Sequence, residues 1–214
     1  MRFKKNRLIL LATSAAWLFM IGAGLGFLWN YENKPGVAAA APPRWPADSR
    51  LRRAGDHATL VMLAHPHCPC TRASIGELAR VMTQAQGRVT AYVLFVKPAS
   101  FSGGWEQTDL WASAKAIPGV SVVRDDEGIE ANRFHAATSG QTMLYDTEGK
   151  LLFSGGLTSA RGHAGDNAGR TAIVSLLTMD EAKQNETPVF GCPLFAPGAE
   201  CRMKKEYDHA SDTN

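Results

Sequence analysis

Apart from its first residues, the chain has almost no net charge. Four of its 23 Lys and Arg residues lie in the first seven positions, and the nineteen others face 20 Asp and Glu residues. No basic stripe is therefore left that would bind a nucleic acid. The sequence also has no glycine-rich loop after a predicted strand that could hold a phosphate group, so we expect no nucleotide and no other organic cofactor.

Charged side chains are missing altogether from a run of 22 residues, 8–29. A helix with a rise of 1.5 Å per residue would be about 33 Å long over this run, enough to cross a hydrocarbon core about 30 Å thick. A cleaved secretory signal has a shorter apolar stretch that is closely followed by a small-residue cleavage site, and the candidate here, residues 38–41, lies well beyond the run. We therefore expect an uncleaved signal-anchor.

The basic first residues should stay in the cytoplasm, because positive charge flanks the cytoplasmic side of membrane helices. Residues 1–30 are then a cytoplasmic stub and a transmembrane helix. For a Gram-negative source, this predicts a single-pass protein of the inner membrane with its carboxyl-terminal part in the periplasm. Residues 31–56 hold four of the eleven prolines and no sustained apolar period, and we interpret them as a linker. A folded domain over 57–184 and a tail over 185–214 complete the expected organisation.

Cysteine is scarce, with four residues in 214, but the four form two close pairs. An even number of cysteines in an exported domain favours disulfide chemistry. Cys192 and Cys201 enclose a short loop in the tail, and we expect them to form a structural disulfide that stabilises the fold by up to about 3 kcal/mol. The alternative is a relay that exchanges electrons with Cys68 and Cys70, which requires the tail to fold back over that pair.

The hydrophobic pattern predicts the order strand, helix, strand, helix, strand, short helix, hairpin, helix. The expected elements are, in chain order, residues 59–64, 72–85, 88–96, 109–117, 120–123, 128–136, 141–155 and 167–184. The first cysteine pair lies between the first strand and the next helix. This arrangement over residues 57–183 resembles the thioredoxin family, and with the anchor the chain is similar to tethered thioredoxin-like proteins of bacterial envelopes. The resemblance implies an α/β fold with a central mixed sheet and flanking helices.

The resemblance also implies the roles of the first cysteine pair. Cys68 would be the attacking thiolate and Cys70 the resolving cysteine of a thiol–disulfide oxidoreductase that exchanges disulfides with protein partners. A thiolate at a helix amino terminus is stabilised by the helix dipole and by free backbone N–H groups, which lower its pKa. We expect His67 and Arg72 to add positive character nearby.

Two features depart from the family pattern. The family has two residues between its cysteines, whereas here Pro69 alone separates Cys68 from Cys70, so we expect a strained and relatively oxidising disulfide. The family also keeps a cis-proline opposite the dithiol, where it aligns substrate backbones. The corresponding residues 139–142 read Ser-Gly-Gln-Thr and contain no proline.

A metal site is the competing interpretation of the same stretch. His65, His67, Cys68 and Cys70 are soft or borderline ligands for copper or zinc. The chain would then resemble the copper-delivering relatives of thioredoxin, which use a cysteine pair and a distant histidine. His163, in the glycine-rich loop before the last helix, is the candidate. This alternative predicts a copper-binding assembly factor or metal chaperone that uses Cys68, Cys70 and His163, with His65 as a further ligand.

Overall fold

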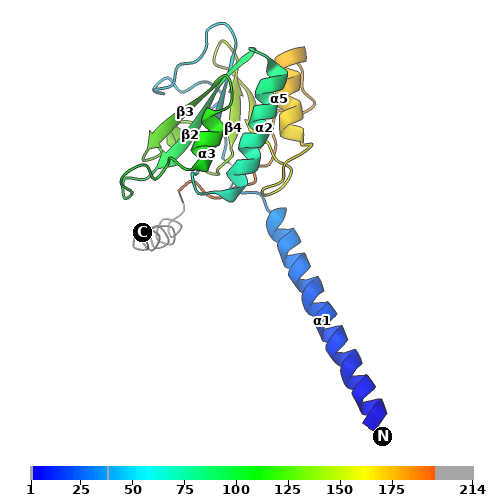
Figure 1. Ribbon diagram of the computed structural model, residues 1–214. Helices are drawn as coiled ribbons and strands as arrows, with labels where there is room; N and C mark the ends of the chain where they lie inside the picture. Colours follow the sequence, from blue (N-terminus) through cyan, green and yellow to red (C-terminus); the bar gives the residue numbers. More distant parts are fainter. Residues whose placement is uncertain (1, 38, 196–214) are drawn as a thin grey trace. The chain divides into compact units, whose positions relative to one another are not determined.

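The computed structural model describes residues 2–37 and 39–195, in two units that span residues 1–34 and 35–214 (Figure 1). The first unit is the helix α1, Arg2–Glu32. Its segment Ile9–Glu32 is 24 residues long, has a mean hydropathy of 1.8 and buries none of its most apolar part. The expected apolar amino-terminal helix is thus present, and its length and composition suffice to cross a membrane.

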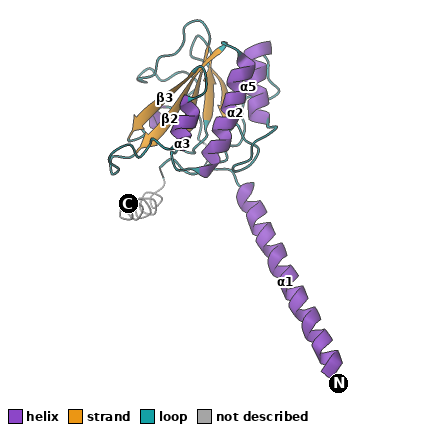
Figure 2. Ribbon diagram, viewed as in Figure 1, coloured by secondary structure: helices purple, strands orange, loops and turns teal. Residues whose placement is uncertain are grey.

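The second unit is built on one mixed sheet (Figure 2). Its strands are β1 (Ala58–Ala64), β2 (Val89–Lys97), β3 (Val120–Asp126), β4 (Thr142–Tyr145) and β5 (Leu151–Gly155). They lie in the order β3-β2-β1-β4-β5. The strands β1, β2 and β3 are parallel, whereas β4 is antiparallel to both β1 and β5. The predicted central mixed sheet is confirmed, with β1 buried in its middle.

Helices cover both faces of the sheet. They are α2 (Pro69–Ala85), α3 (Asp109–Lys115), α4 (Ile129–Arg133) and α5 (Ala168–Met179). Side chains alternate along β1, so that Leu60 and Met62 join the core beneath α2, α3 and α5, while Val61 and Leu63 join the core beneath α4. Figure 1 shows α2, α3 and α5 on the same side of the sheet. The predicted flanking helices are therefore confirmed.

Two helix boundaries differ from the pattern-based expectation for local reasons. The helix α2 begins at Pro69 rather than Arg72, because proline lacks only an N–H that the first turn would leave unpaired anyway. The helix α5 ends at Met179 rather than residue 184, since Asp180 adopts a left-handed conformation with φ of 61°. The first of these differences places Cys70 inside α2.

Residues 35–56 belong to the segment 31–56 that we expected to be a linker, and they pack on the domain. The Trp45 ring meets those of Phe134 and Tyr145 edge-on, with centroids 5.1 and 5.3 Å apart. The Trp45 amide also donates to the Gly149 carbonyl at 2.7 Å. Aromatic contacts of this kind bury large apolar areas. This segment is thus part of the second unit.

Part of the expected tail also packs on the domain. A bridge pairs Glu186 with Ser154 in β5, and another pairs Pro193 with Thr138. The chain therefore returns from α5 to the segment that leads into β4. Cys201 lies outside the described residues, so its disulfide with Cys192 stays a prediction.

Candidate functional site around Cys68

Cys68 stands at the junction between β1 and α2. It is the residue that precedes the first turn of α2, in an extended conformation with φ of −87° and ψ of 115°. Its amide donates to the His65 carbonyl at 3.1 Å, and its own carbonyl accepts from the Thr71 amide at 3.0 Å. The side chains of Cys68 and Cys70 are 1% and 7% exposed. A partner can therefore reach Cys68 only if neighbouring side chains or segments move.

The Cys68 sulfur accepts several hydrogen bonds. The donors are the thiols of Cys192 and Cys70, the Cys192 backbone amide and the Thr71 hydroxyl. These bonds, with the Cys192 thiol first, lower the pKa of Cys68 well below its ordinary value although burial opposes them. Donation to Cys68 and burial raise the pKa of the Cys70 thiol. The arrangement thus favours the thiolate on Cys68 and the protonated thiol on its neighbours.

Cys192, which the sequence placed first in a structural disulfide and only as an alternative in a relay with Cys68 and Cys70, lies at this site. Donation to Cys68 and burial raise the pKa of its thiol, which is free in the structure. The Cys192 carbonyl accepts a hydrogen bond from the Ser139 amide at 2.8 Å. Two residues later in the chain, the Leu194 amide donates to the Ala137 carbonyl at 2.9 Å. Gly191 beside it was the available signal, because glycine allows a backbone to approach another closely.

Ser139 links this region to the cysteine turn from the place where the family has its cis-proline. Its hydroxyl accepts from the His65 amide at 2.8 Å and lies 2.7 Å from the Thr71 hydroxyl. The next residue, Gly140, has φ of +89°, and a Cβ there would lie 2.9 Å from the Ser74 hydroxyl oxygen. No cis peptide bond occurs in the described part of the chain. Hydrogen bonds from Ser139, rather than a proline ring, therefore hold the two segments together.

Arg161 supplies positive charge beside two of the thiols. It hydrogen-bonds to Cys70 and acts against the rise in pKa of both Cys70 and Cys192. Its guanidinium also donates to the Gly191 carbonyl at 2.7 Å. Arg72, which we expected near the thiols, forms an exposed ion pair with Asp109 and lowers the pKa of that carboxyl.

The two histidines before Cys68 pack around Trp105. Burial lowers the pKa of His65 to about 4, so its ring is neutral at pH 7, and its Nδ1 accepts from the His67 amide at 3.2 Å. The His67 ring lies 4.7 Å from the indole of Trp105, which stacks on Phe101 at 4.4 Å. These rings form one wall beside the cysteine turn.

The structure does not assemble the predicted copper ligands. His163 is exposed in the turn after Ala160, and its amide donates to the Ala160 carbonyl. Over residues 2–37 and 39–195, no group of three or more His, Cys, Asp or Glu side chains is arranged to hold a metal ion. The geometry therefore gives the copper alternative no support.

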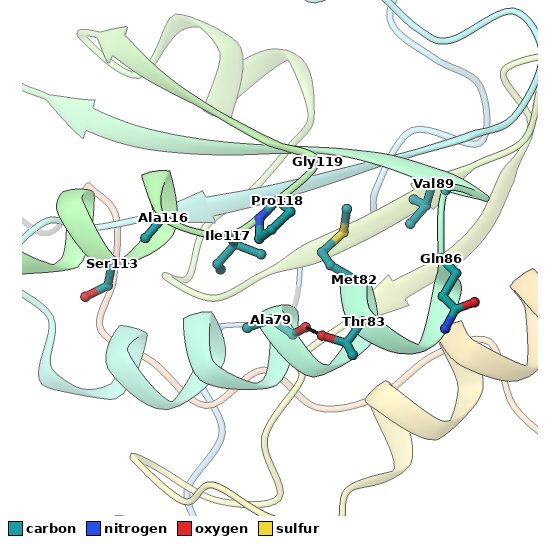
Figure 3. A pocket seen from close by; sticks show the side chains of 11 residues that line it. Ala79, Met82, Thr83, Gln86, Val89, Ser113, Ala116, Ile117, Pro118 and Gly119 are labelled. Carbon is teal, nitrogen blue, oxygen red and sulfur yellow. Dashed lines mark hydrogen bonds between the residues drawn. The ribbon is translucent and has the colours of Figure 1, made fainter.

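A pocket lies at the carboxyl-terminal end of α2, away from the cysteines (Figure 3). It measures about 560 Å³ and is lined by side chains of α2, α3 and the turn before β3, among them Met82, Thr83, Ser113 and Ile117. None of its lining residues is ionisable. The pocket therefore offers space but no acid, base or nucleophile.

Comparisons with known proteins identify the fold and leave the activity open. No family model matches the chain, and no curated protein matches it. One similar solved structure is a hypothetical protein of Sinorhizobium meliloti, with 22% identity, a TM-score of 0.59, and coverage of 77% of this chain and 98% of that one. Another is an uncharacterized conserved protein of Geobacillus kaustophilus, with 18% identity, a TM-score of 0.56, and coverage of 78% and 93%.

The strand order, the antiparallel β4 and β5, and the cysteines that flank the start of α2 decide the fold class. The fold is thioredoxin-like. A secreted disulfide oxidoreductase of Mycobacterium tuberculosis also matches, with 14% identity and a TM-score of 0.37 over 45% of this chain and 66% of that one. A thioredoxin-like fold alone does not establish an activity, so function must be argued from the site.

Proposed function

We propose that the protein is a membrane-anchored thiol–disulfide oxidoreductase of the bacterial envelope. It exchanges disulfides with protein thiols or disulfides through Cys68 and Cys70. The helix α1 spans the inner membrane once, with the basic first residues in the cytoplasm and the thioredoxin-like domain in the periplasm. The substrates are protein partners, and the reaction needs no organic cofactor.

The observation that carries this proposal is the environment of the Cys68 sulfur. Hydrogen bonds from three neighbouring residues and the start of α2 favour the thiolate of Cys68, which is the reactive form of cysteine. The adjacent Cys70 keeps its proton because it donates to that thiolate. A structural disulfide needs no such difference between its two thiols, whereas a nucleophile and its resolving partner do.

The reaction follows from this difference. The Cys68 thiolate attacks one sulfur of a partner disulfide, the partner's S–S bond breaks, and the other partner sulfur leaves as a thiolate that takes up a proton. A second thiol of the site then loses its proton and attacks Cys68, which releases the partner with both of its sulfurs reduced. In the reverse direction, the same steps oxidise a partner dithiol.

The test is a redox titration of the full chain in detergent against reduced and oxidised glutathione, with a copper chelator present and absent. We expect reversible two-electron exchange that the chelator does not change, and its loss in Cys68→Ser. An absence of exchange in the unmodified chain, or exchange that needs copper, would overturn the proposal. Accessibility of the domain to protease in spheroplasts, but not in intact cells, checks its periplasmic location.

A further inference from the structure

Residues 190–194 lie beside the segment that leads into β4 in an antiparallel arrangement. The bridge between Pro193 and Thr138 is flanked by two backbone hydrogen bonds, from Ser139 to Cys192 and from Leu194 to Ala137. Phe190 and Leu194 are buried on either side of Cys192, at 9% and 5% exposure. Five residues of the tail are thus fixed at the site, and Cys192 is in their middle.

The contact at Gly191 leaves no room for a larger residue. A Cβ added there would lie 1.9 Å from the Ser139 carbonyl oxygen, a distance that real Cβ atoms do not reach. Arg161 fixes the same residue from the other side by donating to its carbonyl. These two contacts set the path of the chain immediately before Cys192. The thiol and the amide of Cys192 are thereby close enough to Cys68 to contribute to its lowered pKa.

We propose that Cys192 is a third redox-active residue of the site and forms an intramolecular disulfide with Cys68 during turnover. This inference rests on the proposed function, because it requires Cys68 to be the nucleophile. It adds that the thiol which resolves the mixed disulfide can come from the tail. Cys192 is thereby a catalytic residue, whereas Arg161 and Gly191 are positioning residues.

Ring size favours Cys192 over Cys70 as the partner of Cys68. A disulfide between Cys68 and Cys70 would close a small ring that contains Pro69, whose φ is fixed. It would also join a residue inside the first turn of α2 to the one that caps it. Cys192 approaches from a separate segment, so a disulfide with Cys68 closes no small ring. The tail therefore offers the less strained disulfide.

The resolving step balances in atoms and electrons. After the first attack, Cys68 is joined by an S–S bond to one partner sulfur. The Cys192 thiol gives its proton to solvent, its sulfur attacks the Cys68 sulfur, and the bond between Cys68 and the partner breaks. The partner sulfur leaves with the electron pair and takes up a proton. The partner has gained two electrons, and the Cys68 and Cys192 thiols that supplied them are now a disulfide.

The charges at the site support this order of events. In the resting site the hydrogen bond to the Cys68 thiolate is the first cause of the raised pKa of Cys192, and the charge of that thiolate is another. Both disappear when Cys68 enters a mixed disulfide, because its sulfur is then neutral. Burial still raises the pKa of Cys192, and the positive charge of Arg161 still lowers it, so the pKa of Cys192 falls when the two contributions of Cys68 are lost. Capture of a partner thus prepares Cys192 to attack.

Disulfide mapping of the full chain in detergent tests the proposal. The background is Cys201→Ser, so that Cys192 cannot pair with its neighbour in the tail. Reduced protein is mixed with oxidised glutathione, quenched with acid, alkylated and digested with trypsin. Cys68 and Cys70 then lie in one peptide, 54–72, and Cys192 in another, 184–202. We expect these two peptides to be joined by a disulfide, and still joined when Cys70→Ser is added.

The rate at which bound glutathione leaves Cys68 gives the second measurement. In the Cys70→Ser background, we expect Cys192→Ser to slow this release by roughly 100-fold, because it removes an attacking group held in place. Unfolding curves show whether each variant folds. The inference is overturned if the disulfide forms only within 54–72, or if release is equally fast with and without Cys192. If Cys68 never takes up glutathione, the proposed function itself has failed.

A pair of glycine variants tests whether the position of Cys192, rather than only the presence of its thiol, matters for the release of glutathione. Gly191→Ala inserts a methyl group against Ser139 and displaces Cys192, so we expect slower release of glutathione once Cys68 has captured it. Gly76→Ala is the matched control, since a Cβ at that exposed position in α2 meets nothing within 4 Å. Equal release rates in these two variants would contradict a role for the fixed path of the tail.

Discussion

The two ends of α2 differ in chemistry although one helix connects them. At its amino-terminal end, the pKa of Cys68 is lowered by hydrogen bonds from Cys70 and Thr71 of the same turn and from Cys192 of the distant tail. At its carboxyl-terminal end, the pocket lined by Met82 and Thr83 contains no ionisable group (Figure 3). This cavity is therefore a poor guide to the reactive region. The reactive region is better identified by groups that stabilise a charged atom, here the Cys68 sulfur.

Among the substitutions considered at the two ends of α2, replacing Cys68 should have the largest effect on disulfide exchange. We expect Cys68→Ser to abolish disulfide exchange with glutathione, because a hydroxyl at that position is not ionised near neutral pH and forms no mixed disulfide. The measurement is the amount of glutathione bound per chain after quenching. Cys70→Ser serves as the control and should still bind glutathione at Cys68. Binding by the Cys68→Ser chain at the rate of the unmodified chain would place the nucleophile elsewhere.

Glu77 connects the middle of α2 to the loop before α5, and its loss should destabilise the fold. Its fully buried carboxylate accepts from the Gly165 amide at 2.9 Å and the Asn167 amide group at 3.2 Å, and it pairs with Arg170. We expect Glu77→Ala to lower the free energy of unfolding by about 3–5 kcal/mol, since it leaves Arg170 without its buried partner.

Urea unfolding of the full chain in detergent measures the effect of Glu77→Ala. The control is Glu77→Gln, which keeps the shape and one acceptor oxygen, and which should cost less. A loss below about 1 kcal/mol for Glu77→Ala would show that this network does not hold the loop.

His65 should make stability depend on pH at the reactive end of α2. Because its pKa falls from 6.5 in the unfolded chain to about 4 in the fold, the unfolded state takes up a proton first as the pH decreases. The contribution of His65 to the free energy of unfolding is complete above the pKa of the unfolded state. It is lost as the pH falls toward the pKa of the folded state. We expect the free energy of unfolding to decrease by about 2 kcal/mol from pH 7 to pH 5 on account of this residue.

The pH series should be repeated with His65→Asn, whose side-chain oxygen can still accept from the His67 amide. The difference between the two series isolates the histidine. Identical pH dependence in the two proteins would mean that the His65 ring is not held neutral by the fold.

A substitution at the passive end of α2 should have the smallest effect. Thr83 is exposed, and its hydroxyl donates only to the Ala79 carbonyl of the same helix at 2.9 Å. We expect Thr83→Ala to change the free energy of unfolding by less than about 0.5 kcal/mol and to leave glutathione exchange unchanged. A changed rate of glutathione exchange would show that the carboxyl-terminal end of α2 affects the reactivity of Cys68, and it would contradict the chemical difference between the two ends.

Local patterns were enough to predict most of the fold. Alternating and helical periodicities gave every strand and helix of the domain in the right order, because each depends on residues close together in sequence. The position of Cys68 and Cys70 between β1 and α2 followed from the same local reading. The linker prediction for residues 31–56 missed the packing of Trp45, since proline content describes the backbone and not what one indole can contact.

The rest of the site depends on contacts between distant segments. Cys192 is more than a hundred residues from Cys68, and its place next to Cys201 suggested a local disulfide. Only the pairing of the tail with Ser139 brings it to the thiolate. Arg161 likewise reaches the thiols from the loop after β5. No periodicity or spacing encodes such docking, although glycine beside a cysteine indicates a close approach.

The pH dependence of Cys68 alkylation tests the thiolate at the start of α2 most directly. The full chain, reduced and in detergent, is treated with iodoacetamide over a range of pH, and fragmentation of the peptide 54–72 distinguishes Cys68 from Cys70. We predict that the Cys68 rate has its midpoint well below the ordinary pKa of a thiol, and that Cys192→Ser raises this midpoint, because the Cys192 thiol is the first cause of the lowered value. A midpoint at or above the ordinary value in the unmodified chain would contradict an activated Cys68.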